Sequence, residues 1–168
     1  MTNPAVLGID FGRVINDASS HPSGNDTSFL KGGDEEMLAT PAMADCFESV
    51  TRLCDRFTGR VWIVSKAGPR IQENTERWLI HHDFFTLTGV APDHVRFVRR
   101  RIDKAPVCRE LGITHFVDDR PEVLETLIGL VPHLYLFGPK TKACALPVVE
   151  VPTWKEAERE ILASLAAK

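Results

Sequence analysis

Near its N-terminus the chain reads Ala5-Val6-Leu7-Gly8-Ile9-Asp10-Phe11-Gly12-Arg13-Val14, an apolar run that ends in a carboxylate and a glycine turn. The apolar part has the length of one buried strand. Asp10 closes that strand, where an ionised side chain is costly unless it is paired or bound to a ligand. We therefore expect Asp10 to serve chemistry rather than packing, at the edge of a sheet.

Short apolar runs and helical patterns alternate through the rest of the chain. Further strands are expected at 61–64, 95–98, 115–117, 134–137 and, at a sheet edge, 148–151. Helices are expected from Thr40-Pro41 to about 57, from Pro69 to about 82, from about 105 to 111, from Pro121 to about 128, and after Thr153, which forms a capping box with Glu156. This alternation predicts a Rossmann-like α/β fold in three layers, with helices on both faces of a central parallel sheet.

The length of 168 residues fits one domain, 1–168, because no linker or repeat divides it. Residues 16–40 are polar and show no clear periodicity, and about 25 residues is long for a loop in a compact domain. We interpret this segment as a flap or minimal cap insertion. The helix after Ser65 is expected to lead straight to the strand at 95–98, which leaves no room for a second cap and predicts an open crevice.

Composition narrows the function classes. The formal net charge of −3 gives no basis for nucleic-acid or membrane binding, and no apolar run approaches the roughly 20 residues of a membrane span. No signal peptide is recognisable, so we expect a cytoplasmic protein. The cysteines form no CxxC pair and are expected to be reduced and mostly buried, with a metal cluster or disulfides as the alternative: Cys46, Cys54, Cys108 and Cys144.

Reactive side chains follow three of the expected strands: Asp10, Ser65 and the pair Asp118-Asp119. In an open parallel sheet these ends border one crevice, and Lys104, which opens the preceding helix, can reach it. Three carboxylates on one rim call for a cation, and their hard oxygen ligands suit Mg²⁺. A hydroxyl and an ammonium group suit a phosphate, and the backbone N–H groups of Phe11 and Gly12 add an anion cradle.

These residues resemble the four motifs of the haloacid dehalogenase superfamily, whose members are mostly phosphatases. The motifs are the segment from Asp10 to Val14, then Ser65, Lys104, and His115-Phe116-Val117-Asp118-Asp119-Arg120-Pro121. The resemblance spans about residues 5 to 140. The last motif, together with Lys104, looks like the deoxyribonucleotidase-type branch, and nucleotides are therefore candidate substrates.

The resemblance implies a role for each residue. Asp10 would be the nucleophile that forms an aspartyl-phosphate, and also a magnesium ligand together with the carbonyl of Gly12. Ser65 and Lys104 would bind the phosphoryl group. Asp118 would bind the metal, and Asp119 would bind it directly or through water. The implied activity is Mg²⁺-dependent hydrolysis of a phosphorylated substrate, small or large.

Gly12 departs from the superfamily pattern, because most of its phosphatases carry a second aspartate there. That aspartate protonates the leaving group, a contribution typically of about 10² to 10⁴ in rate. Three interpretations stay open. The chain is a phosphatase or phosphotransferase that needs little acid help or whose substrate or flap supplies the proton, or a phosphate-binding module without turnover, or a dehalogenase, against which Asp118 and Asp119 argue. Asp17 is a possible alternative acid, although a solvated loop acid is the default interpretation.

Several cations flank the expected crevice. Lys66 follows Ser65 directly and is expected at the substrate, and Arg13 could meet a second anionic group or lie on the surface. A basic run precedes Lys104: Arg96, Arg99, Arg100 and Arg101. This run fits either electrostatic attraction of an anionic substrate or a solvated basic face.

Overall fold

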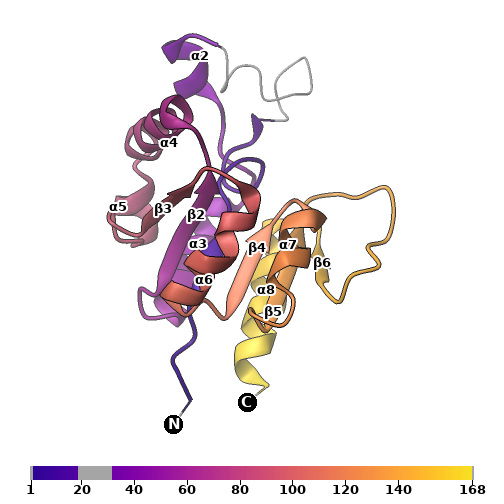
Figure 1. Ribbon diagram of the computed structural model, residues 1–168. Coiled ribbons are helices and arrows are strands. Elements are labelled where there is room, and N and C mark those ends of the chain that lie inside the picture. Colours follow the sequence, from indigo (N-terminus) through magenta and orange to yellow (C-terminus); the bar gives the residue numbers. More distant parts are fainter. Residues whose placement is uncertain (1, 19–31, 168) are drawn as a thin grey trace.

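The computed structural model describes residues 2–18 and 32–167. Its centre is a six-stranded sheet in the order β3-β2-β1-β4-β5-β6, in which all neighbours are parallel (Figure 1). The strands are β1 (Leu7–Ile9), β2 (Val61–Lys66), β3 (Val95–Val98), β4 (His115–Asp118), β5 (His133–Phe137) and β6 (Val149–Val151). The predicted parallel α/β sheet is confirmed, including β6 as an edge strand.

Helices cover both faces of the sheet and complete the three predicted layers (Figure 1). They are α2 (Asp34–Ala39), α3 (Cys46–Arg56), α4 (Pro69–His81), α5 (Phe84–Thr88), α6 (Lys104–Leu111), α7 (Pro121–Leu127) and α8 (Trp154–Ala166). Apolar side chains of α3, α4, α5 and α8 form one core, and those of α6 and α7 form the other. The prolines that begin α4 and α7 occupy first helical positions, where the missing N–H costs nothing.

The central strand β1 lies between β2 and β4, with Ile9 beside Ile63 on one side and Val117 on the other. Gly8 is a glycine for a steric reason: a Cβ atom there would lie 2.6 Å from the Phe116 ring. The close approach lets the Phe116 ring pack over β1 itself.

The segment between β1 and α3 differs from the prediction. Thr40 ends α2 instead of capping the next helix, and Ala42 pairs with Asn16 in an antiparallel bridge, so α3 begins only at Cys46. The expected flap, residues 16–40, thus contains a helix, with Met37 buried, while residues 19–31 of that segment lie outside the described residues. The five-residue helix α5 was also not predicted.

Two buried tryptophans attach this segment and the loop after β1 to the body of the protein. The Trp78 indole N–H donates to the carbonyl of Thr40 at 2.8 Å, and that of Trp154 donates to the carbonyl of Val14 at 2.7 Å. Both side chains are fully buried. Because a buried carbonyl without a donor is costly, these bonds fix the backbone that follows Asp10.

The four cysteines are free thiols in this structure, and three of them are buried, as expected for cysteines that pack in the core. Burial raises the pKa of the Cys108 thiol to about 12 and so keeps it protonated. Over residues 2–18 and 32–167, the helices are too short or too polar to cross a bilayer.

Candidate active site

The sheet register brings the predicted strand-end residues together. Asp10 follows Ile9 directly, and its backbone N–H donates to the carbonyl of Val117 at 2.9 Å, which sets it beside Asp118. On the other side of β1, Ser65 lies near the end of β2. Residues from three separate parts of the sequence therefore meet at one edge of the sheet, as expected for parallel strands.

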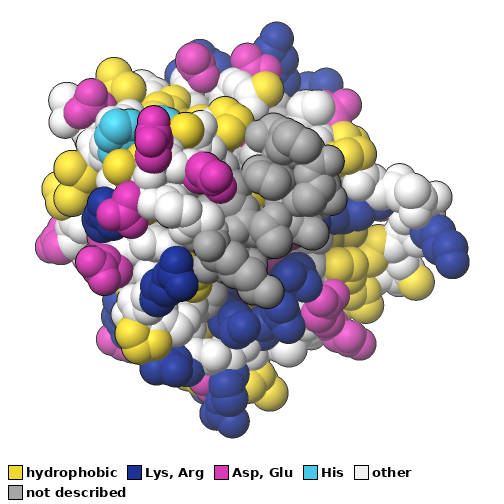
Figure 2. Space-filling view, turned by 90° about the horizontal axis from the view of Figure 1, so that it is seen from above, with side chains coloured by type: hydrophobic (Ala, Val, Ile, Leu, Met, Phe, Trp, Pro, Cys, Tyr) yellow, Lys and Arg dark blue, Asp and Glu magenta, His cyan; other side chains and the backbone are white. Residues whose placement is uncertain are grey.

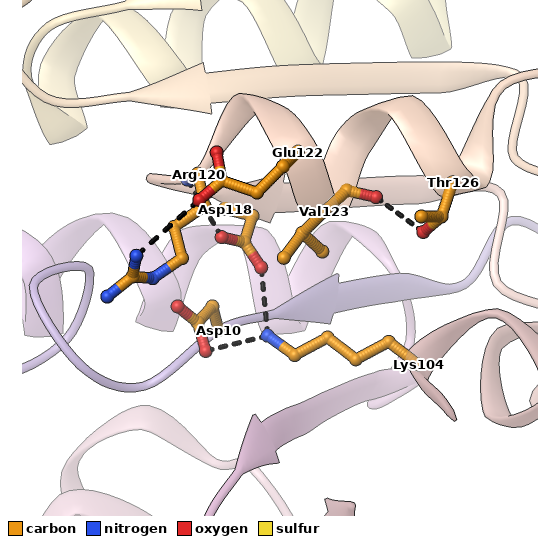
Figure 3. A network of polar contacts seen from close by, with 7 residues as sticks. All are labelled: Asp10, Lys104, Asp118, Arg120, Glu122, Val123 and Thr126. Atoms are coloured by element: carbon orange, nitrogen blue, oxygen red, sulfur yellow. Dashed lines mark hydrogen bonds and ion pairs between the residues drawn. The ribbon is translucent and has the colours of Figure 1, made fainter. Parts of the chain in front are cut away.

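Lys104 joins two of the three carboxylates (Figure 3). Its Nζ donates to Asp10 Oδ1 at 2.9 Å and to Asp118 Oδ2 at 2.8 Å. All three side chains are buried, with Lys104 2% and Asp118 0% exposed. Burial alone would lower the pKa of Lys104, but the two carboxylates raise it, so the ammonium stays charged. The second oxygen of Asp118 accepts the backbone N–H of Arg120 at 3.0 Å.

The three carboxylates carry more negative charge than Lys104 alone can balance. Asp10, Asp118 and Asp119 each offer an oxygen, and these atoms lie within 4.8 Å of one another. Burial, followed by the charge of Asp10, raises the pKa of Asp118 to about 8 and that of Asp119 to about 6. These raised pKa values indicate that the ionised carboxylates repel one another, and a further cation would stabilise the ionised cluster.

A pocket of about 220 Å³ opens above this cluster. Every predicted site residue except Asp118 lines it, namely Asp10, Phe11, Gly12, Ser65, Lys66, Lys104 and Asp119, and Asp118 lies buried beneath. The Phe11 ring is 2% exposed and packs edge-on against Trp78, at 5.3 Å between centroids. Phe11 can therefore serve a ligand only through its backbone. The catalytic and binding roles of these residues remain predictions.

Within residues 2–18 and 32–167, there is open space beside Gly12, at the position where a second carboxylate was expected. A Cβ atom built there has no heavy atom of these residues within 4 Å, and the backbone of Gly12 lies outside the left-handed region. The loop that follows is tight: Phe11 O accepts the N–H of Ile15 at 2.8 Å, and Arg13 adopts a left-handed φ of 62°. Asp17, the alternative acid, is not among the described residues that line the pocket.

No protein-family model matches the sequence, and no curated protein matches it. Solved structures do match. A haloacid dehalogenase-like family hydrolase from Xanthomonas campestris has a TM-score of 0.66 at 11% identity, with 95% of each chain covered. The chain has the haloacid dehalogenase-like fold. A HAD-superfamily hydrolase from Ehrlichia chaffeensis gives 0.64 at 10% identity, over 98% of this chain and 99% of that one.

A third similar structure, a HAD family hydrolase from Deinococcus radiodurans, contains bound phosphate and sodium. It has a TM-score of 0.62 at 15% identity, with 98% of this chain and 96% of that chain covered. Identities this low establish the fold, which hosts many activities, and leave function to the site itself. The resemblance to the deoxyribonucleotidase-type branch stays a prediction.

Within this haloacid dehalogenase-like fold, the acidic cluster fits a divalent cation. Its ligands are hard carboxylate oxygens, and the described chain places a single ammonium, that of Lys104, between two of the carboxylates. Mg²⁺ is bound in proteins by one or two carboxylates with water and substrate phosphate. Asp10 and Asp119 border the pocket and would supply such ligands. Gly12 lines the same pocket, and its backbone carbonyl would be a further ligand.

Sequence reasoning missed several lining residues and left the basic run undecided. Ile71, Thr75, Asn16, Ala18, Val123 and Arg120 also line the pocket. In the basic run, Arg96 pairs with Glu110 and Arg100 with Asp103, whereas Arg101 lines the pocket. The run is therefore partly a solvated face and partly a wall of the site. Arg120 carried a sequence signal, because it follows Asp118-Asp119 directly.

Proposed function

We propose that this protein is a Mg²⁺-dependent phosphomonoester hydrolase that uses Asp10 as its nucleophile. The observation that carries the proposal is the Asp10 carboxylate, held 2.9 Å from the buried Lys104 ammonium at the base of a pocket. An aspartate carboxylate at the floor of a pocket can attack a bound phosphoryl group and form a covalent intermediate.

The proposed reaction has two steps. In the first, an Asp10 oxygen attacks the phosphorus, the ester P–O bond breaks and the leaving oxygen takes a proton. In the second, water attacks the phosphorus of the aspartyl-phosphate, which releases phosphate and regenerates Asp10. Ser65 and Lys104 bind phosphoryl oxygens and hold the phosphorus in line. Bound Mg²⁺ would supply charge stabilisation at these oxygens.

The missing acid at Gly12 limits which esters react well. Gly12 offers no side chain to protonate the leaving oxygen, so water or the substrate must supply that proton. We therefore expect a preference for esters with stable leaving groups, or for substrates that carry their own acid. Nucleoside monophosphates are included as candidates because of the motif resemblance around Asp118-Asp119.

A panel of phosphate esters, including aryl phosphates and nucleoside monophosphates, tests the proposal in the presence of Mg²⁺. We expect phosphate release by the native protein and by Asp55→Asn, a change of an exposed acid on α3 that is not among the pocket-lining residues. Asp10→Asn and chelation of the metal by EDTA should each abolish release. Activity that survives either treatment would sink the mechanism.

A second candidate function is phosphate binding without turnover, favoured by the absent side chain at Gly12. In that case Mg²⁺ and phosphate would bind, measured by calorimetry, while no ester of the panel is hydrolysed. Turnover that Asp10→Ala abolishes would eliminate this candidate. Phosphoryl transfer to an acceptor alcohol would appear in the same panel as a phosphorylated acceptor in place of free phosphate.

A further inference from the structure

The pocket is lined by more cations than the acidic cluster and its neighbours engage. Five cationic side chains line it: Arg13, Lys66, Arg101, Lys104 and Arg120. Lys104 is bound by Asp10 and Asp118, Arg120 lies 3.5 Å from Glu122, and Arg13 also interacts within the protein. Lys66 and Arg101 therefore remain for a second anionic group.

Lys66 and Arg101 are the cations with the most freedom to bind such a group. Both are exposed, and neither forms a salt bridge with another residue in 2–18 or 32–167. Their neighbours in the basic run are committed elsewhere, since Arg96 pairs with Glu110 and Arg100 with Asp103. Figure 2 shows a group of Lys and Arg side chains in the lower central part of this face, with others scattered around its edge.

The sheet brings Lys66 close to the segment that carries Arg101. Lys66 is in register with Val98 of β3, and the N–H of Ala67 donates to the carbonyl of Val98 at 2.9 Å. Arg101 follows three residues later, in the 3₁₀ turn Arg101–Asp103 that leads directly into Lys104. Both cations line the pocket that Ser65 and Lys104 also line.

We propose that Lys66 and Arg101 bind a second anionic group of the substrate, so that the preferred substrates are phosphomonoesters that also carry a carboxylate or a second phosphate. The inference rests on the proposed function, because it assigns the reacting phosphate to the Ser65 and Lys104 side of the same pocket. Arg101 supplies a planar fork of donors that matches either anion, and Lys66 supplies a point charge.

Binding of non-hydrolysable phosphonates tests this independently of turnover. Three probes share a three-carbon skeleton: propylphosphonate, 3-phosphonopropionate and 1,3-propylenebisphosphonate. In Mg²⁺, calorimetry should show at least about tenfold tighter binding of one or both of the probes that carry a second anionic group than of propylphosphonate. Arg101→Gln should reduce that advantage about tenfold. Arg109→Gln, an exposed arginine of α6 outside the pocket, is the matched control and should leave the advantage intact.

The outcomes distinguish the second anionic site from the proposed hydrolase function, and a site for a carboxylate from a site for a second phosphate. An advantage for 3-phosphonopropionate identifies a carboxylate site, and an advantage for the bisphosphonate alone identifies a phosphate site. Equal binding of all three probes, no binding of any, or equal losses in Arg101→Gln and Arg109→Gln would overturn the inference. Failure of the proposed function is a different result, namely tight phosphonate binding without hydrolysis of any ester.

Discussion

Replacing Gly12 with aspartate should raise the rate of hydrolysis, because the structure has room for the missing acid. The Cβ atom meets no heavy atom of the described residues within 4 Å, and the Gly12 backbone lies outside the left-handed region that favours glycine. Gly12 lines the same pocket as Asp10, so an added carboxylate would lie near the proposed nucleophile. The substitution therefore restores a proton donor without displacing a neighbour in the described part of the chain.

The expected gain follows from what a positioned acid contributes. General acid–base catalysis supplies about 10² to 10⁴ in rate, or about 3 to 5 kcal/mol of transition-state stabilisation. The gain should be large for alkyl phosphates, whose leaving oxygen needs a proton. It should be small for p-nitrophenyl phosphate, whose leaving group departs as a stabilised anion.

We would measure steady-state phosphate release by the native protein and by Gly12→Asp in Mg²⁺. The rate of the variant divided by the native rate is then obtained for an alkyl ester and for an aryl ester. Gly12→Ala is the matched control, since it adds the same Cβ without the acid and should leave both rates unchanged. An equal gain from Gly12→Ala would refute the reasoning. An unchanged alkyl ester rate in Gly12→Asp would refute it as well, and would mean that the proton comes from elsewhere.

Four further predictions concern metal binding and stability. Mg²⁺ should raise the melting temperature more at pH 8 than at pH 5, because the raised pKa of Asp119, about 6, lets protons compete for the site, and an equal rise at both pH values in scanning fluorimetry would contradict this. The metal-free protein should lose stability as pH rises through the same range, because the folded state holds the proton of Asp119 more tightly than the unfolded state, and a melting temperature in EDTA that does not fall would contradict this. Lys104→Met should lower the free energy of unfolding in EDTA by about 3–5 kcal/mol, because two buried carboxylates lose their partner, and a loss below about 1 kcal/mol in urea titrations would argue against the pairing. Trp154→Phe removes the donor to Val14 O and should cost about 1–3 kcal/mol in the same titrations. Gly8→Ala should cost about 1–3 kcal/mol through overpacking, and a neutral result would show that the strand gives way easily.

The strands and most helices could be predicted because local signals suffice for them. The strand Val95–Val98 is a short apolar-rich run with polar neighbours, and Pro69 and Pro121 mark helix starts through their own geometry. The start of α3 could not be read in this way. Thr40-Pro41 has the local form of a helix start, but the pairing of Ala42 with Asn16 holds this stretch extended. A contact between distant segments overrides local preference there.

The candidate site was predictable as a set of strand-end residues, but not as a balance of charges. Parallel topology alone brings Asp10, Ser65 and Asp118 to one edge of the sheet. In the basic run, Arg100 pairs with Asp103, whereas Arg101, in the 3₁₀ turn that follows, lines the pocket. Sequence spacing does not show which arginine of the run faces the pocket, so the proposed second anion site depends on the folded structure.

The central claim is that Asp10 accepts the phosphoryl group, and acid quenching of a single turnover with phosphorus-labelled aryl phosphate and Mg²⁺ tests it most directly. We predict that label appears on the peptide containing Asp10 in the native protein, that it is lost on continued incubation as phosphate is released, and that it is absent from Asp10→Asn. Steady release of phosphate with no label on that peptide, or with label on a peptide that lacks Asp10, would contradict the account.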